Sequence, residues 1–84
     1  MPETEVTLTN EVGLHARPAA LFAKAAAGYP ADVRLAKADR EVNAKSLLSV
    51  LTLDVRGGDT VRIVTDGEEA EAALTALAKL VGEL

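Results

Sequence analysis

Hydrophobic and polar residues alternate in three segments of this chain, and such alternation predicts β-strands that are buried on one side. The segments are residues 3–9, 32–37 and 60–65, and the last has the clearest strand composition. A turn at residues 38–39 leads from the second segment into a further short strand that ends at Val42. This turn lacks the Asn-Gly or Asp-Gly pair that most strongly indicates a hairpin. The pattern therefore predicts four strands.

Two segments near the ends of the chain have the spacing of α-helices. Residues 16–27 are rich in alanine, with Pro18 in the first turn, where its missing N–H costs nothing, and Gly28 after the last turn. The final helix is predicted to begin with a capping box, in which Asp66 and Glu69 bond to the first backbone N–H groups. Its apolar stripe consists of Ala70, Ala73, Leu74, Leu77, Val81 and Leu84.

A third, short helix is predicted over residues 47–53, LLSVLTL, with Ser46 as its N-cap. Leucine or valine occupies every position of this segment except Ser49 and Thr52, whereas a helix that rests on a core buries about half of its circumference. Some of its leucines should therefore remain exposed and form a contact surface for a partner. Burial of the helix on more than one side would explain the same pattern, and the pattern leaves both interpretations open.

The predicted element order is β-α-β-β-α-β-α. It indicates an α+β fold, an open-faced β-sandwich with a mainly antiparallel four-stranded sheet and three helices on one face. No repeat or linker divides the chain, so residues 1–84 are expected to form one domain. The acidic start MPETEV differs from a secretory signal, and no apolar run is long enough to cross a membrane. We expect a cytoplasmic protein.

Composition narrows the possible chemistry. The chain has no cysteine and one histidine, which excludes disulfides and thiolate nucleophiles and disfavours a zinc site, so we expect neither a metal nor a cofactor. Its net charge is -4, and Phe22 and Tyr29 are its only aromatic residues, so nucleic-acid binding is not expected. Arg17 and Lys24 nevertheless make the surroundings of His15 locally basic, which favours a small anion or an acidic partner surface.

His15, in the stretch GLHARPA, is the candidate reactive group. Its imidazole is largely neutral at neutral pH, so a ring nitrogen can act as a nucleophile. The helix that follows offers unpaired N–H groups and the positive end of its dipole to an anion, and Arg17 adds a guanidinium suited to phosphate oxygens. A purely structural histidine stays open on the residues alone, whereas a metal ligand or a general base lacks the neighbours it would need.

The chain also lacks a phosphate-binding GxxxxGK[ST] loop and an evident acidic magnesium site. A protein that can hold a phosphoryl group but cannot bind its small-molecule donor is predicted to be a carrier, with other proteins as its substrates.

GLHARPA at residues 13–19 and EVNAKSLLSVLTLDV at residues 41–55 closely resemble HPr, the histidine-containing phosphocarrier family of the bacterial phosphoenolpyruvate:sugar phosphotransferase system. The resemblance covers essentially the whole chain. It implies a stoichiometric carrier rather than an enzyme, in which His15 accepts a phosphoryl group on Nδ1, as pros-phosphohistidine, from enzyme I. The group then passes to EIIA domains for sugar uptake, and Arg17 matches the arginine that neutralises it during transfer.

The resemblance also implies a docking face for several partners and a regulatory site. Ser46 matches a position that an HPr kinase/phosphorylase modifies in many relatives, which adds this kinase and a catabolite-control regulator as further partners. The chain is expected to be a monomer. The docking face is expected to include Phe22, Lys24, Lys45, Leu47, Leu48 and Leu51.

Two other functions remain open at the level of sequence. The chain could be a paralogue that serves a nitrogen-related or regulatory phosphorelay instead of sugar uptake. It could also be a regulatory adaptor that docks through its apolar helix face without phosphoryl chemistry, although the intact His15 and Arg17 argue against this.

Overall fold

The computed structural model describes residues 2–8, 14 and 16–83. The predicted element order is confirmed. The elements are β1 (Glu3–Thr7), α1 (Ala16–Ala27), β2 (Asp32–Lys37), β3 (Arg40–Asn43), α2 (Leu47–Thr52), β4 (Thr60–Asp66) and α3 (Ala70–Glu83). Most of these bounds lie within one or two residues of the predicted ones, and the start of α3 is the main exception.

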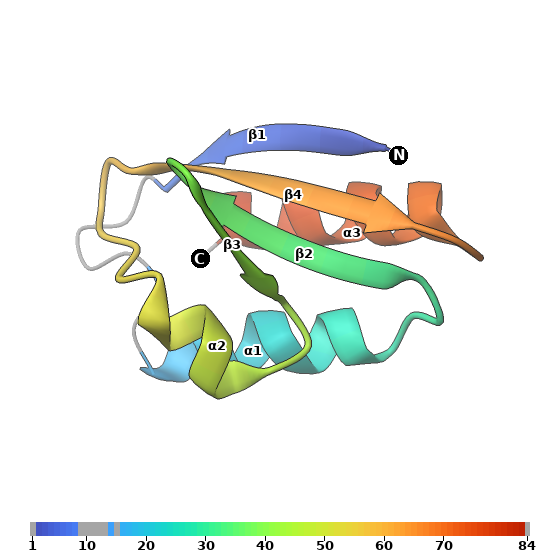
Figure 1. The fold of residues 1–84 in the computed structure, drawn as a ribbon, viewed down its shortest axis with the longest axis horizontal. Helices are drawn as coiled ribbons and strands as arrows, with labels where there is room; N and C mark the ends of the chain where they lie inside the picture. The colour runs from blue at the N-terminus through green and yellow to red at the C-terminus, as the bar shows by residue number, and fades with distance from the viewer. Residues whose placement is uncertain (1, 9–13, 15, 84) are drawn as a thin grey trace.

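The four strands form one antiparallel sheet in the order β1-β4-β2-β3 (Figure 1). Strand β4 lies inside the sheet and pairs with β1 and β2, while β3 returns from β2 as a hairpin at the opposite edge. Helix α3 lies behind the sheet in Figure 1, α1 runs below the sheet, and α2 packs beside α1 and near β3. This arrangement confirms the predicted open-faced architecture.

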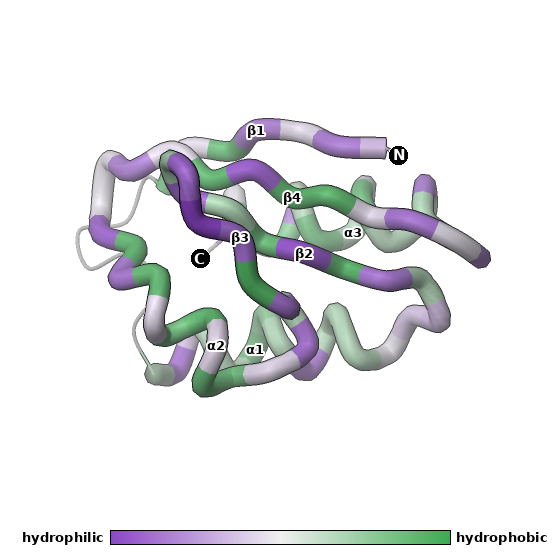
Figure 2. Tube along the Cα trace, in the orientation of Figure 1, coloured by the Kyte–Doolittle hydropathy of each residue, from purple (hydrophilic) through white to green (hydrophobic). Residues whose placement is uncertain are grey.

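The register of the sheet places the apolar residues of neighbouring strands opposite one another. Leu35 of β2 pairs with Ile63 of β4 on one side and with Val42 of β3 on the other. Figure 2 shows how hydrophobic and hydrophilic residues alternate along β2 and along much of β4. Because side chains in a strand point alternately to opposite faces, this register directs the apolar set toward the helices and the charged set toward solvent.

Phe22 belongs to the hydrophobic core, with none of its side chain exposed. It lies on the buried face of α1 together with Ala19, Ala23 and Ala26, which follow the helical spacing of a core-facing stripe. The prediction that Phe22 contributes to the docking face is therefore wrong. Phe22 is the one large side chain among the small alanines of this buried face, whereas the neighbouring Leu21 is exposed.

The predicted capping box of the last helix is also wrong. Asp66 is the last residue of β4, where it pairs with Asp32, and α3 begins only at Ala70. Glu69, with a φ of 63°, precedes the helix, and its carbonyl accepts the bond of 2.9 Å from Ala73 N that opens the helix. The strand pairing therefore overrides the local preference of Asp66 for a helix start.

Gly28 follows α1 as predicted, but its backbone does not take the left-handed conformation that favours glycine after a helix. Its N–H instead donates to the Ala25 carbonyl at 3.1 Å, and Tyr29 N donates to the Ala26 carbonyl at 3.2 Å. Helix α1 therefore ends in a tightened turn of the 3₁₀ type.

The hairpin between β2 and β3 turns through Ala38, whose φ is 55°. An alanine in the left-handed region costs about 1 kcal/mol or more, because its Cβ crowds the backbone. We expect Ala38→Gly to raise the free energy of unfolding by about 0.5 kcal/mol, after the greater flexibility of glycine in the unfolded chain is subtracted. Urea unfolding measures this change.

Ala72→Gly is the matched control, since Ala72 is exposed on α3 in ordinary helical conformation. This control should lose about 1 kcal/mol of stability. Destabilisation of both variants to a similar extent would contradict strain at Ala38.

Candidate functional site

The beginning of α1 is the predicted site of phosphoryl chemistry. Arg17 is exposed in the first turn, Pro18 is half-buried beside it, and the first turn contains no acidic residue. The N–H groups of this turn have no acceptor within the helix, and the helix dipole places partial positive charge there. His15 itself lies outside the described residues. The helix that begins directly after His15 in the sequence therefore has a basic first turn that is rich in hydrogen-bond donors.

Two residues that precede His15 are bonded to one distant stretch of chain, residues 55–59. Leu14, which precedes His15, is buried, and its N–H donates to the Val55 carbonyl at 2.9 Å. Leu8 is also buried, and it bonds twice, through its N–H to the Asp59 carbonyl at 2.9 Å and through its carbonyl to the Gly58 N–H at 2.8 Å. Residues 55–59 therefore hold both Leu8 and Leu14.

Helix α2 begins as predicted. Ser46 has an extended backbone, and its Oγ accepts a hydrogen bond of 3.3 Å from the Ser49 N–H, which confirms it as the N-cap. The Ser46 side chain bonds an otherwise unpaired donor of the first turn, and its residue is half-buried. This cap fixes where α2 starts relative to the leucines that follow.

Helix α2 exposes part of its apolar surface and buries the rest. Leu47 is 37% exposed and Leu48 is 76% exposed, whereas Val50 and Leu53 are buried. Leu51 is half-buried and packs against the core. The prediction that some of these leucines stay exposed is confirmed for Leu47 and Leu48.

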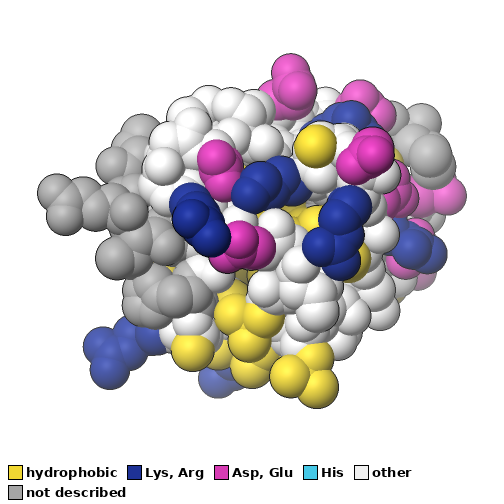
Figure 3. Space-filling view, turned by 60° about the vertical axis from the view of Figure 1, so that its left-hand side comes forward, with side chains coloured by type: hydrophobic (Ala, Val, Ile, Leu, Met, Phe, Trp, Pro, Cys, Tyr) yellow, Lys and Arg dark blue, Asp and Glu magenta, His cyan; other side chains and the backbone are white. Residues whose placement is uncertain are grey.

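The neighbouring helix α1 adds Leu21, which is 49% exposed and which the sequence reasoning missed. Its position out of phase with the buried stripe of α1 could have indicated this. We call Leu21, Leu47 and Leu48 the apolar patch. Figure 3 shows hydrophobic side chains gathered toward one edge of the molecule, over α1 and α2, with basic side chains at the margin of this region.

The two predicted docking lysines differ in their surroundings. Lys24 is exposed near the end of α1. Lys45 is half-buried, and its Nζ donates to the Tyr29 carbonyl at 2.8 Å, which ties the approach to α2 to the exit of α1. Lys24 therefore offers a more accessible charge to an acidic partner than Lys45 does.

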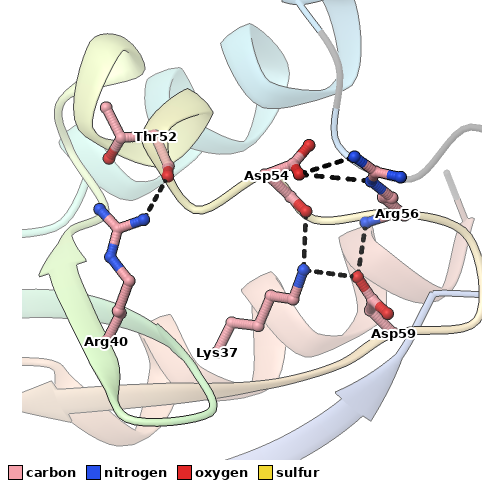
Figure 4. Close-up of polar contacts among 6 residues, drawn as sticks. All are labelled: Lys37, Arg40, Thr52, Asp54, Arg56 and Asp59. Carbon is pink, nitrogen blue, oxygen red and sulfur yellow. Dashed lines mark hydrogen bonds and ion pairs between the residues drawn. The ribbon is translucent and has the colours of Figure 1, made fainter.

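Two basic side chains from the β2–β3 hairpin bond to carbonyl groups at the end of α2 (Figure 4). Arg40 Nη1 donates to the Thr52 carbonyl, and Lys37 Nζ donates to the Asp54 carbonyl, each at 2.7 Å. Cations at the carboxyl end of a helix complement its dipole and pair its free carbonyls. The hairpin thereby stabilises the transition from α2 into the following loop.

The loop after α2 carries two carboxylates with defined partners. Asp54, with a φ of 53°, accepts from Arg56 at 3.0 Å, and this hydrogen bond is the main cause that raises the pKa of Arg56. Asp59 accepts from Lys37 Nζ and from the Arg56 backbone N–H, both at 2.8 Å. The Lys37 hydrogen bond, followed by the Arg56 N–H, lowers the pKa of Asp59. Sequence spacing contained no signal for this cluster.

The lowered pKa of Asp59 makes its contribution to stability dependent on pH. A carboxyl group whose pKa is lower in the folded chain stabilises that chain above its unfolded pKa, and the stabilisation disappears as the pH falls through the folded pKa. We therefore expect wild type to exceed Asp59→Asn in stability at neutral pH, with the difference vanishing as the pH falls below about 4. Urea unfolding at a series of pH values tests this.

The same comparison in a Lys37→Met background is the control, because the Asp59 contribution should shrink there. A wild-type advantage that is independent of pH would contradict the argument.

Within the described part of the chain, no three His, Cys, Asp or Glu side chains gather as a metal site would require, and no pocket is found. None of the helices in residues 16–83 is long and apolar enough to cross a membrane.

Comparison with known proteins decides the family. The family model described as the PTS HPr component phosphorylation site matches residues 2–83. The chain belongs to the HPr family of phosphocarrier proteins.

Individual HPr relatives agree with this assignment over nearly the full length. The phosphocarrier protein HPr of Streptomyces coelicolor is 49% identical over 84 residues, which covers 99% of this chain and 90% of the relative. A crystal structure of HPr-C-His from Thermoanaerobacter tengcongensis has a TM-score of 0.95 at 36% identity, and covers 99% of this chain and 93% of that one.

HPr-like proteins named Crh are also similar. The HPr-like protein Crh of Bacillus subtilis is 40% identical over 83 residues, which covers 99% of this chain and 98% of Crh. A crystal structure of that protein, solved as a dimer with a swapped domain, has a TM-score of 0.80 and covers 99% of this chain and 95% of that one.

Proposed function

We propose that this chain accepts a phosphoryl group on Nδ1 of His15 from phospho-enzyme I and passes it to EIIA domains for sugar uptake. The observation that carries the proposal is the position of the lone histidine, one residue before the donor-rich start of α1, with Arg17 exposed in the first turn. Membership of the phosphocarrier family supports it.

In the proposed transfer, the neutral imidazole attacks phosphorus while the bond between phosphorus and its donor atom on enzyme I breaks. The Arg17 guanidinium and the N–H groups at the start of α1 stabilise the negative charge on the phosphoryl oxygens. The phosphorus–nitrogen bond retains a high transfer potential, so the same step runs again toward the EIIA acceptor. An open site suits this relay, because docking of each partner excludes water only while transfer occurs.

Docking to these partners is assigned to the apolar patch and the neighbouring basic residues. Leu47, Leu48 and Lys24 are exposed to solvent, and Leu51 and Lys45 are half-buried. Acidic partner surfaces would meet Arg17 and the lysines, and transient exchange needs only modest affinity. We propose that the chain acts as a monomer in the cytoplasm.

The first experiment combines the purified chain with enzyme I, phosphoenolpyruvate and magnesium, and records the intact mass before and after mild acid. The proposal expects one acid-labile phosphoryl group, which is lost to an added EIIA domain. A chain that stays unmodified with several competent enzyme I preparations would overturn it. That result would favour the regulatory adaptor function, for which the similarity to Crh is the supporting observation.

A modification at Ser46 should regulate docking rather than folding. Aspartate is as good an N-cap as serine, so Ser46→Asp keeps α2 while it adds negative charge beside Leu47 and Leu48. We expect the KM for enzyme I to rise about tenfold at low salt, and less at high salt, from repulsion by an acidic partner. Steady-state phosphorylation kinetics measure it.

Ser46→Asn is the matched control, since it caps the helix without a charge. An equal KM for the aspartate and asparagine variants would contradict this regulatory role.

A further inference from the structure

We propose that the ion pair between Lys37 and Asp59 is a positioning device for the chain segment that enters residue 15. This inference rests on the proposed function, because it assigns the pair an effect on phosphoryl transfer at His15. Lys37 lies at the end of β2 and Asp59 just before β4, and neither belongs to α1 or to the apolar patch. Both are therefore positioning residues that act through the backbone.

Leu8 and Leu14 are anchored to the same stretch of chain. Both residues bond through backbone groups to residues 55–59, and both side chains are buried. Leu14 directly precedes His15 in the chain. The conformation of residues 55–59 therefore helps to set the position of Leu14, the residue before His15.

Residues 55–59 include two adjacent glycines, Gly57 and Gly58, and Gly58 has a φ of 90°. Two adjacent glycines do not hold a loop in one conformation by themselves. Asp59 closes this turn, because its Oδ2 accepts from the Arg56 N–H at 2.8 Å and its own N–H donates to the Arg56 carbonyl at 3.0 Å.

Lys37, at the end of β2, connects this turn to the sheet. Lys37 Nζ donates to Asp59 Oδ2 at 2.8 Å and to the Asp54 carbonyl at 2.7 Å, so one ammonium group spans the loop (Figure 4). The two side chains are 28% and 33% exposed, which makes this pair less solvated than the Arg56–Asp54 pair nearby. An ion pair shielded in this way can hold a loop that glycines would otherwise loosen.

The test compares Lys37→Met with wild type in two measurements at a temperature well below unfolding. Amide hydrogen exchange at Leu8 and Leu14 should become at least tenfold faster, because the carbonyl groups that accept from these two amides lie in the released loop. The maximal rate of phosphoryl transfer from phospho-enzyme I should fall about tenfold with little change in KM, since misplacement of a reacting group slows the chemical step. Lys37→Arg should keep most of the slow amide exchange and most of the wild-type transfer rate, because arginine retains the positive charge.

Two controls separate positioning from general loss of stability. Asp32→Asn removes a carboxylate from the Arg34–Asp32 pair on β2, whose N–O distance is 3.3 Å, and should leave both readouts unchanged. Ala72→Gly destabilises α3 and should leave the transfer rate unchanged. If Lys37→Met shows the same amide exchange at Leu14 and the same transfer rate as Ala72→Gly, the proposal is overturned.

Failure of the proposed function would be visible separately. If wild type accepts no phosphoryl group, the carrier proposal fails and with it the role of the pair in transfer. The exchange rates of Leu8 and Leu14 would still decide whether Lys37 and Asp59 hold the backbone before residue 15.

Discussion

His15→Ala is expected to abolish phosphoryl acceptance from phospho-enzyme I. His15 is the only histidine of the chain, and cysteine is absent, so no second imidazole or thiolate can take over. Intact mass after incubation with enzyme I, phosphoenolpyruvate and magnesium should show no acid-labile group in the variant and one in wild type. The variant should still fold, which its far-UV circular dichroism and urea unfolding would verify.

Arg17→Ala is the informative companion, because it retains the nucleophile and removes only the cation. We expect complete but slow phosphorylation, with the transfer rate reduced about 100-fold, as for the loss of one group that stabilises charge in a transition state. Arg34→Ala removes an exposed arginine from β2 and should transfer at the wild-type rate. An acid-labile phosphoryl group on His15→Ala would place the acceptor elsewhere and refute the assignment of His15.

Phe22→Ala is expected to cost about 3–5 kcal/mol of the free energy of unfolding. The ring is fully buried, and its neighbours along the buried face of α1 are alanines, which are too small to fill the cavity. Native domains are stable by only about 5–15 kcal/mol, so this loss is a large fraction of the total stability. Urea unfolding followed by circular dichroism measures the loss.

Leu48→Ala is the matched control on the exposed side of the helical layer. Leu48 is 76% exposed, so its truncation should change stability by less than about 0.5 kcal/mol while raising the KM for enzyme I. If Phe22→Ala had normal stability but bound enzyme I poorly, Phe22 would belong to the docking face, and its role in the core would be contradicted.

The features that the sequence predicted correctly depend on neighbours along the chain. Alternation indicated β2 and β4 because side chains in a strand face opposite sides with a period of two. Ser46 was identified as a cap because capping joins residues three positions apart. Arg17 was placed at a helix start because Arg17 and the first turn of α1 lie in the same short motif.

The features that only the tertiary structure decided depend on contacts between distant residues. Helix α3 begins at Ala70 because Asp66 pairs with Asp32 across the sheet, which local capping preferences do not include. Phe22 points into the core and Leu21 to solvent because of where α1 rests on the other elements.

The contacts of the residues that precede the candidate site also join distant parts of the chain. Leu14 bonds to Val55 and Lys37 to Asp59, and no local pattern in the sequence marks either pair. The sequence by itself therefore determined the order of the elements and marked the candidate reactive motif, since both depend on short-range spacing. The tertiary structure decided which side chains are available to a partner and which hold the loop, because burial and long-range bonds arise only when the sheet has assembled.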